Sequence, residues 1–474
     1  MVNRKILLLL IVILGFGLRY YGATSIPPAW DEIINEFPDA QKISFSPENI
    51  NLPIVDKTPE GGVMVSKYII VLGWYLFGNS VMGARLPFIL LGTFNIILIY
   101  LLVKQNFNTP TALISALLFS ISQYSIGGCR FSDSQPCNIM MVILSLIVFC
   151  NAIKRSSKWL IMLNGLIMGV AFWFYENLIF LVPIYIIFLL LSPDYRYWLK
   201  SKYLWISFAI TFFVAVPLVI LNLAPGAERF GFIYNEATIG FSLNATGMYL
   251  GEIILLAIKP FANLFDFVAG SLDSEKPPVN FVLGILILFS VARSFKDKHF
   301  FVRLLVICFM FHFVAFSLVR RNDVIQSVWS LGSLDWGNTS FIPGVILLAI
   351  LLYKQFKNRM RRGLLLLSGL VFFMLIKTWN FVSYPMCYFF PVREFFLEGS
   401  YDDIEYYRSI GQTEYVKDIL ISIFRATRNE EIKQRAVLEL SEVLINEVRN
   451  ETVEEYLPGA ILEKSGEGIA NEKY

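Results

Sequence analysis

The sequence predicts an all-α polytopic membrane protein with about eleven transmembrane helices, a large first extracytoplasmic loop, interfacial helices and a small external helical tail. Three observations lead to this fold class. Of the 474 residues, 56% are hydrophobic and 16% are charged, and the mean hydropathy is +0.60, beyond what a water-soluble domain carries. Long apolar segments recur along most of the chain, and basic clusters occupy alternate loops between them.

Each transmembrane helix needs about 20 mostly apolar residues. The opening segment MVNRKILLLLIVILGFGLRYYG is read as a retained first helix, because no small-residue cleavage site follows it. The predicted spans lie near residues 5–21, 85–103, 109–127, 136–153, 159–175, 177–192, 203–223, 279–295, 301–319, 340–354 and 363–384.

The basic residues set the predicted orientation, because cytoplasmic loops are enriched in lysine and arginine. With eleven spans, every large basic cluster falls on one side, which is then cytoplasmic together with the N-terminus. Counting either of two further apolar stretches, 63–78 or 247–268, as a span would move later clusters outside. We therefore expect both stretches to lie at the external interface or to re-enter it.

In this topology, residues 1–387 form the transmembrane domain, and residues 22–84 form a large external loop rich in acids. The short loop 128–135 brings Arg130 and Asp133 to the same surface. The tail 388–474 is predicted to be a small external helical appendage, and its last dozen residues look disordered. Its helical pattern places apolar residues on one buried face, at Ile432, Ala436, Val437, Leu440, Val443, Leu444 and Val448.

Composition also excludes some classes of function. A net charge of +3 gives no indication of nucleic-acid binding. The five cysteines form no CxxC pair and are interpreted as small buried hydrophobes, although Cys129 and Cys137 are near enough in sequence for an external bridge. Two histidines are too few for a histidine-rich zinc site.

Three motifs of the first 180 residues carry a family resemblance. "PPAWDE" follows the first span, "TPEGGVMVSKYIIVLGWYLFGNSVMGARLPFILLG" leads into the second, and "GCRFSDSQPCNIMM" follows the third. In order and spacing they resemble the membrane glycosyltransferases of the GT-C type, which include protein O-mannosyltransferases and the lipid A aminoarabinose transferase. No single motif is specific, but their order on an eleven-span topology is a much stronger signal than any one of them. The resemblance covers roughly residues 1–180.

The resemblance implies transfer of a sugar from a polyprenyl-phosphate donor to an acceptor on the extracytoplasmic face, with inversion. A carboxylate at the membrane surface can act as the general base. Asp31, the first acid of the DE pair, is expected to be that base. Glu32 is a further catalytic candidate, expected to orient Asp31 or cap a helix rather than to react directly. Asp133 matches the second acid of the family. Some relatives need a divalent metal ion for this step. If this protein needs one, Asp31 and Asp133 are expected to be its ligands.

The donor phosphate needs cationic partners. The basic residue that relatives use before the interfacial helix is missing, since Pro59, Glu60, Gly61 and Gly62 stand there. Its role is expected to fall to Lys67, Arg130, Arg320 or Arg321. Arg85 is interpreted as mainly structural, snorkelling at the start of a span, and Glu176 as an exposed acid in a tight outer turn.

The expected partners are membrane lipid, the lipid-linked donor, and a protein, lipid or glycan acceptor. The main alternative is a multi-pass lipid or glycan transporter, in which the acids bind a proton or an ion. The sequence shows no inverted repeat, and its acids lie in loops. A glycan polymerase or ligase would be expected to have its largest external loop late in the chain. Both readings are therefore less favoured than a glycosyltransferase.

Overall fold

The computed structural model describes most of the predicted membrane domain and parts of the tail. The described residues are 3–46 apart from 22, 24–31 and 33–35; 49–52; 65–174 apart from 133; 180–223; 279–318; 338–383; and, in the tail, 404, 408, 413, 416–417, 420–421 and 430–446.

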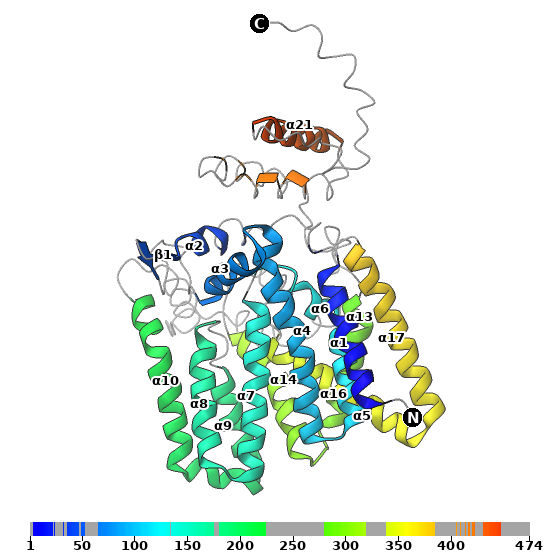
Figure 1. The fold of residues 1–474 in the computed structure, drawn as a ribbon. Helices are drawn as coiled ribbons and strands as arrows, with labels where there is room; N and C mark the ends of the chain where they lie inside the picture. Colours follow the sequence, from blue (N-terminus) through cyan, green and yellow to red (C-terminus); the bar gives the residue numbers. More distant parts are fainter. Residues whose placement is uncertain are drawn as a thin grey trace, which may run out of the picture.

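A helix lies at each of the eleven predicted segments in the described part of the chain. These helices are α1 (Arg4–Tyr20), α4 (Val81–Asn106), α5 (Thr109–Ser120), α7 (Gln135–Arg155), α8 (Lys158–Phe172), α9 (Leu181–Leu191), α10 (Lys202–Leu223), α13 (Val279–Ser294), α14 (Phe300–Leu318), α16 (Asn338–Asn358) and α17 (Met360–Ser383). They stand side by side as a bundle (Figure 1).

Length and composition alone qualify fewer of them as spans. Among the described residues, α4, α7 and the part of α16 from Phe341 are long and apolar enough to cross a bilayer. A fourth span results if the 3₁₀ helix η4 (Pro193–Lys200) and α10, bent by 67° at their junction, count as one. The number eleven therefore stays a prediction, while the mostly helical architecture is confirmed.

Local sequence signals define several helix ends. Ser80 caps α4 by accepting a hydrogen bond from the backbone N–H of Gly83 (3.0 Å), and Asn108 caps α5 in the same way through Thr111 (3.0 Å). α7 ends in a left-handed residue, Ser156 (φ 48°). Such caps satisfy backbone groups that would otherwise lack partners at a helix end, and they explain the tight turns between successive helices.

One predicted span is broken. The segment 109–127 forms α5 and then a separate short helix, α6 (Gln123–Gly127), because Ser122 caps a new helix start through the N–H of Ser125 (3.2 Å). The carbonyls freed at the break accept hydrogen bonds from distant side chains. Arg19 of α1 donates to Ser120 O (3.1 Å) and Thr378 of α17 donates to Ile121 O (2.6 Å). These hydrogen bonds therefore hold α1 and α17 against the end of α5.

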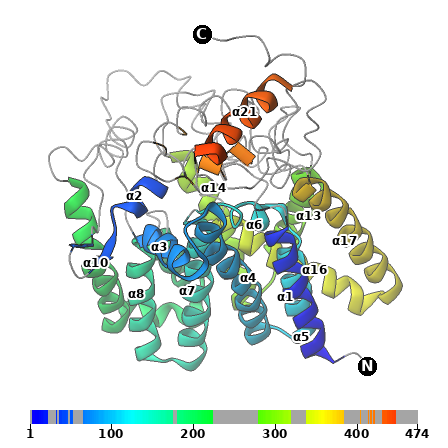
Figure 2. The same cartoon turned by 45° about the horizontal axis from the view of Figure 1, so that its top comes forward.

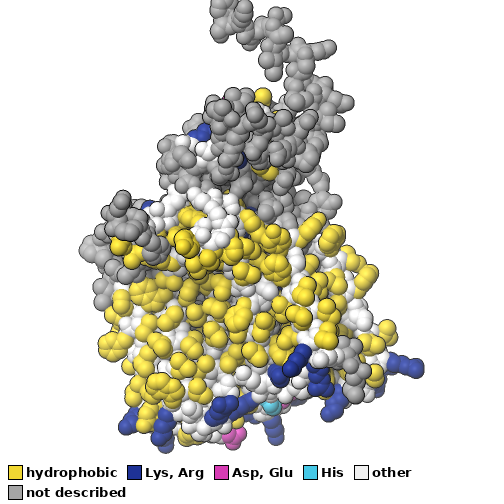
Figure 3. Space-filling model, viewed as in Figure 1, with side chains coloured by type: hydrophobic (Ala, Val, Ile, Leu, Met, Phe, Trp, Pro, Cys, Tyr) yellow, Lys and Arg dark blue, Asp and Glu magenta, His cyan; other side chains and the backbone are white. Residues whose placement is uncertain are grey.

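The two ends of the bundle differ in charge. Lysine and arginine side chains gather at the end where the chain begins, below a broad band of hydrophobic side chains (Figures 1 and 3). At that end Lys354 of α16 pairs with Asp297 (2.7 Å). The segregation agrees with the predicted placement of the basic clusters on one side of the membrane.

The opposite end carries the elements of the first loop. They are α2 (Phe37–Gln41), a hairpin of β1 (Ser44–Ser46) and β2 (Asn49–Asn51), and α3 (Val65–Phe77). α2 packs on α3, and α3 packs on the start of α4. α3 occupies the stretch predicted to be interfacial. The second such stretch, 247–268, lies outside the described residues.

The antiparallel hairpin departs from the all-α prediction. Phe45 pairs with Ile50, and two residues separate the strands, which is the length of the commonest hairpin connections. Apolar and polar residues alternate along "ISFSPENINL", a period-2 pattern that favours strands and was not used in predicting the loop.

In the tail, α21 (Glu430–Asn446) carries the predicted buried face. Ala436, Leu440 and Val443 are buried, whereas Leu438 on the other face is 63% exposed. Figures 1 and 2 show α21 at the same end as α2 and α3, away from the N-terminus. The four described cysteines, Cys129, Cys137, Cys150 and Cys308, are buried, and no disulfide joins Cys129 to Cys137.

Candidate functional site

A buried ion pair joins the first loop to the start of α4. Arg85 donates from Nε to Glu32 Oε1 (3.0 Å) and from Nη2 to Glu32 Oε2 (2.5 Å), and their side chains are 0% and 1% exposed. Such a two-pronged arrangement is the strongest geometry available to an arginine and a carboxylate. The predicted snorkelling of Arg85 is wrong, because its guanidinium is held inside the protein by Glu32.

Glu32 also reaches the third motif. Its Oε1 accepts a hydrogen bond from the backbone N–H of Ser132 (2.7 Å). Arg85 in turn donates from Nη1 to Ala23 O (2.7 Å) and lies over the ring of Phe131, 5.4 Å from its centroid. One carboxylate therefore connects three parts of the chain: the first loop, the start of α4 and the loop before α7.

Arg130 lies buried beside this pair. Its Nη2 donates to Tyr21 O (2.6 Å), while its Nε and Nη1 have no hydrogen-bond partner among the described residues. Burial, together with the positive charge of Arg85, lowers the pKa of Arg130 to about 9.

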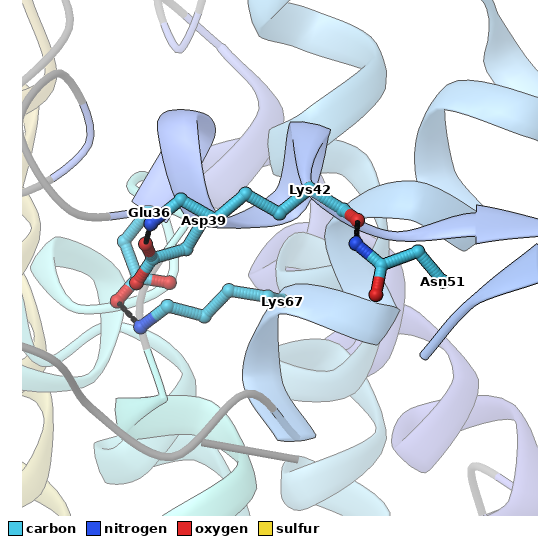
Figure 4. A network of polar contacts seen from close by, with 5 residues as sticks. All are labelled: Glu36, Asp39, Lys42, Asn51 and Lys67. Carbon is cyan, nitrogen blue, oxygen red and sulfur yellow. Dashed lines mark hydrogen bonds and ion pairs between the residues drawn. The ribbon is translucent and has the colours of Figure 1, made fainter. Parts of the chain in front are cut away.

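Lys67 of α3 forms a second buried pair. Its Nζ lies 2.6 Å from Glu36 Oε1, at the start of α2 (Figure 4). On the same helix Asp39 accepts a hydrogen bond from Lys42 Nζ (2.8 Å), and the Lys42 carbonyl accepts one from the side chain of Asn51 in β2 (2.6 Å). This polar chain runs from the hairpin through α2 to α3.

Arg19 was missed in the sequence, although an arginine inside an apolar helix is costly and therefore informative. It is fully buried near the outer end of α1. In addition to Ser120 O, its guanidinium donates to Gly15 O (2.8 Å) and to Ser125 Oγ (2.8 Å). These bonds fix the end of α1, from which the first loop departs, against α5 and α6.

The structure describes Glu32, Lys67, Arg85 and Arg130 among the residues singled out in the sequence. Asp31, Asp133, Arg320, Arg321 and Glu176 lie outside the described residues. In the part of the chain that is described, no group of three His, Cys, Asp or Glu side chains is arranged to hold a metal ion. The described site is thus a buried set of ion pairs next in sequence to both predicted catalytic acids.

Comparison with protein families gives a direct match to this region. Residues 58–221 match the family described as dolichyl-phosphate-mannose-protein mannosyltransferase. The resemblance to polytopic membrane glycosyltransferases is confirmed. The matched segment includes Lys67, Arg85 and Arg130 and extends into α10. No curated protein matches the sequence.

Solved structures give the fold. ArnT from Cupriavidus metallidurans, crystallised with undecaprenyl phosphate, is 14% identical, with a TM-score of 0.52 over 93% of this chain and 74% of ArnT. The shared feature at this identity is the fold. The oligosaccharyltransferase of Archaeoglobus fulgidus, in a complex with Zn and sulfate, is 16% identical with a TM-score of 0.49. The match covers 91% of this chain and 56% of the oligosaccharyltransferase, so this chain spans little more than half of that protein.

Proposed function

We propose that this protein transfers a sugar from a polyprenyl-phosphate donor to an acceptor hydroxyl on the extracytoplasmic face of the membrane. The mannosyltransferase family match over residues 58–221 supports this activity. The ArnT fold supports it as well, since ArnT itself binds undecaprenyl phosphate. Protein, lipid and glycan acceptors are all compatible with the described residues.

The observation that carries the proposal is the hydrogen bond between Glu32 and Ser132. Asp31 precedes Glu32 in the chain and Asp133 follows Ser132. The Glu32 carboxylate and the Ser132 N–H are 2.7 Å apart. The sequence neighbours of the two acids are thus tied together, although the acids come from loops about 100 residues apart. This supports a shared site for Asp31 and Asp133.

In the proposed reaction, the acceptor oxygen attacks the anomeric carbon of the donor sugar from the face opposite the phosphate. Asp31 takes the proton of the acceptor hydroxyl as the new bond forms. The bond between the anomeric carbon and the phosphate oxygen breaks, and its electron pair leaves on the polyprenyl phosphate. The configuration at the anomeric carbon is therefore inverted.

The leaving phosphate gains negative charge and needs cations nearby. Of the four proposed donor-binding cations, Lys67 is already paired with Glu36, and Arg320 and Arg321 lie outside the described residues. Arg130 is buried with Nε and Nη1 unpartnered within the described part. We therefore propose Arg130 as the principal phosphate-binding group and Lys67 as a second, weaker one.

Glu32 does not fit as a metal ligand, because Arg85 and Ser132 engage its two oxygens. If a divalent ion takes part, Asp31 and Asp133 would hold it with donor phosphate and water. Such an ion would neutralise charge on the leaving phosphate.

The proposal is tested with purified protein and a panel of polyprenyl-phosphate sugars. Release of free polyprenyl phosphate should depend on an added acceptor extract, and Asp31→Asn should lower turnover about a hundred- to ten-thousand-fold while donor binding stays near normal. Donor movement across proteoliposomes without transfer would instead identify a transporter. An undiminished rate for well-folded Asp31→Asn would remove the assignment of the base.

A further inference from the structure

A cluster of buried apolar side chains lies next to the charged residues of the candidate site. We call it the external apolar cluster. From the first loop and the membrane helices it contains Phe37, Ala40, Ile70, Val81, Ala84, Phe88 and Cys137, and from the tail it contains Ile404, Val416, Leu420, Ala436, Leu440 and Val443. The buried side chains of the tail belong to the same packed cluster as those of α2, α3 and α4.

Residues of the cluster are close in sequence to the charged residues of the site in each of these helices. Glu36 immediately precedes Phe37 in α2, and Lys67 lies one helical turn before Ile70 in α3. In α4, Arg85 directly follows Ala84, and Val81 and Phe88 lie one turn to either side of it. Because residues three or four apart share a helix face, the cluster residues of α3 and α4 lie beside Lys67 and Arg85.

α2 depends most on this packing. It has five residues, too few to be stable as an isolated helix, and it holds its place through tertiary contacts. Phe37 packs against Trp74 of α3 with ring centroids 6.0 Å apart. Glu36, at the start of α2, carries the carboxylate that holds Lys67. Movement of α2 would therefore move the partner of Lys67.

The tail uses one face for this contact. Along α21, Ala436, Leu440 and Val443 follow the spacing of a single helical face and are at most 6% exposed. Arg408 pairs with Glu439 (3.4 Å) and so links an earlier part of the tail to α21. Since the cluster buries side chains from both sides, removing the tail would expose apolar surface of α2, α3 and α4 to water.

We propose that the tail segment 404–446 is a positioning element: docked on the external apolar cluster, it fixes α2 and α3 and thereby holds Glu36 and Lys67 where the donor phosphate binds. The proposal rests on the proposed function for its kinetic part. Its structural part, the dependence of α2 and α3 on the tail, is independent of any activity.

The test compares two substitutions on the same helix of the full-length protein. Leu440→Asp places a carboxylate in the cluster, whereas Leu438→Asp places the same group on the exposed face of α21. Amide hydrogen exchange is measured over residues 36–41 and 65–77, with 135–172 as an internal reference. For Leu440→Asp we expect at least tenfold faster exchange than in the wild-type protein in both test segments. Leu438→Asp and Leu440→Ile should show the wild-type exchange rate.

Unchanged exchange at 65–77 in a Leu440→Asp protein whose α21 has lost its protection would overturn the proposal. If the aspartate variant cannot be purified, Leu440→Ala takes its place with the same expectations at smaller amplitude. Loss of protection throughout the reference segment as well would also count against a local positioning role.

The kinetic measurement uses the polyprenyl-phosphate sugar that the wild-type protein consumes. Leu440→Asp is expected to raise the apparent KM for donor about tenfold, with a smaller change in kcat, and Leu438→Asp to change neither. An unchanged donor KM together with lost protection of α3 would remove the link to the phosphate. If the wild-type protein consumes no donor, the proposed function fails, while the exchange experiment still decides whether the tail positions α2 and α3.

Discussion

Buried charges at the end of the bundle away from the N-terminus show how single residues determine the architecture of the site. A buried ion pair gains little net stability, since desolvation of both ions offsets their attraction, but removing one partner leaves an uncompensated charge and is costly. Glu32 and Arg85 are such a pair. Its value lies in specificity, because it allows one arrangement of three distant segments.

Glu32→Gln is therefore expected to act first on stability. It leaves the Arg85 guanidinium buried without its counter-charge, a change that typically costs about 3–5 kcal/mol. Thermal unfolding in detergent should show a clear loss of stability. Glu439→Gln, which removes the partner of the exposed Arg408 and Arg435, is the control and should cost no more than about 1 kcal/mol for each exposed pair. Equal effects of the two changes would argue against a tightly held Glu32–Arg85 pair.

Arg130 is expected to act on donor binding. Its unpartnered Nε and Nη1 are suited to a phosphate, and hydrogen bonds to charged groups contribute about 1.5–3 kcal/mol. Arg130→Gln should accordingly raise the donor KM about ten- to a hundredfold, and Arg130→Lys should recover part of the loss. Arg196→Gln, at an exposed arginine bonded to Leu190 O, is the control. A wild-type donor KM in Arg130→Gln would place the phosphate elsewhere.

At the scale of elements, the packing of α3 on α4 requires a glycine. A Cβ added at Gly73 would lie 2.4 Å from the backbone oxygen of Gly83 and 2.7 Å from the ring of Pro87. Backbone atoms cannot move aside as a flexible side chain can. The close approach of these two helices brings Lys67 and Arg85 to one side of the molecule, so the glycine indirectly supports the site.

Gly73→Ala should therefore separate α3 from α4 even though alanine favours a helix by about 1 kcal/mol over glycine. We expect a lower melting temperature and faster hydrogen exchange in residues 65–77. Gly369→Ala in α17 is the matched control, because a Cβ there meets nothing within 4 Å, and it should leave stability equal or slightly higher. A fully stable Gly73→Ala protein would contradict the described packing.

The elements also show which features the sequence could predict. Apolar runs of sufficient length located the helices, because a helix buries its own backbone polar groups in lipid. The break after Ser120 and the hairpin at 44–51 were missed, although Ser122 and the alternating pattern carried local signals. The pairing of Glu32 with Arg85, and of Glu36 with Lys67, was not predictable, because partners 53 and 31 residues apart are set by tertiary packing.

At the scale of the whole molecule, the two ends of the bundle have different roles. Basic side chains gather at the end at which the chain begins (Figure 3), whereas α2, α3 and α21 lie at the other end (Figures 1 and 2). A lipid-linked donor has its phosphate at a membrane surface. The polarity of the bundle fits a reaction carried out at a single face, and it agrees with the prediction that the basic end is cytoplasmic.

This polarity leads to a topology prediction for α17, which runs between the two ends (Figure 1). Arg361 and Arg362 lie at the start of α17, which continues to Ser383. A reporter fused after Arg362 is expected to be cytoplasmic and one fused near Tyr401 to be external, as measured by a pair of reporters active on opposite sides of the membrane. A control fusion after Arg155, at the basic end of α7, should report the cytoplasm.

If the fusions after Arg362 and near Tyr401 report the same side, α17 does not span the membrane, and the tail cannot share a face with the external apolar cluster in the native membrane. The external location proposed for the transfer reaction would then have to be reassigned together with Asp31 and Asp133.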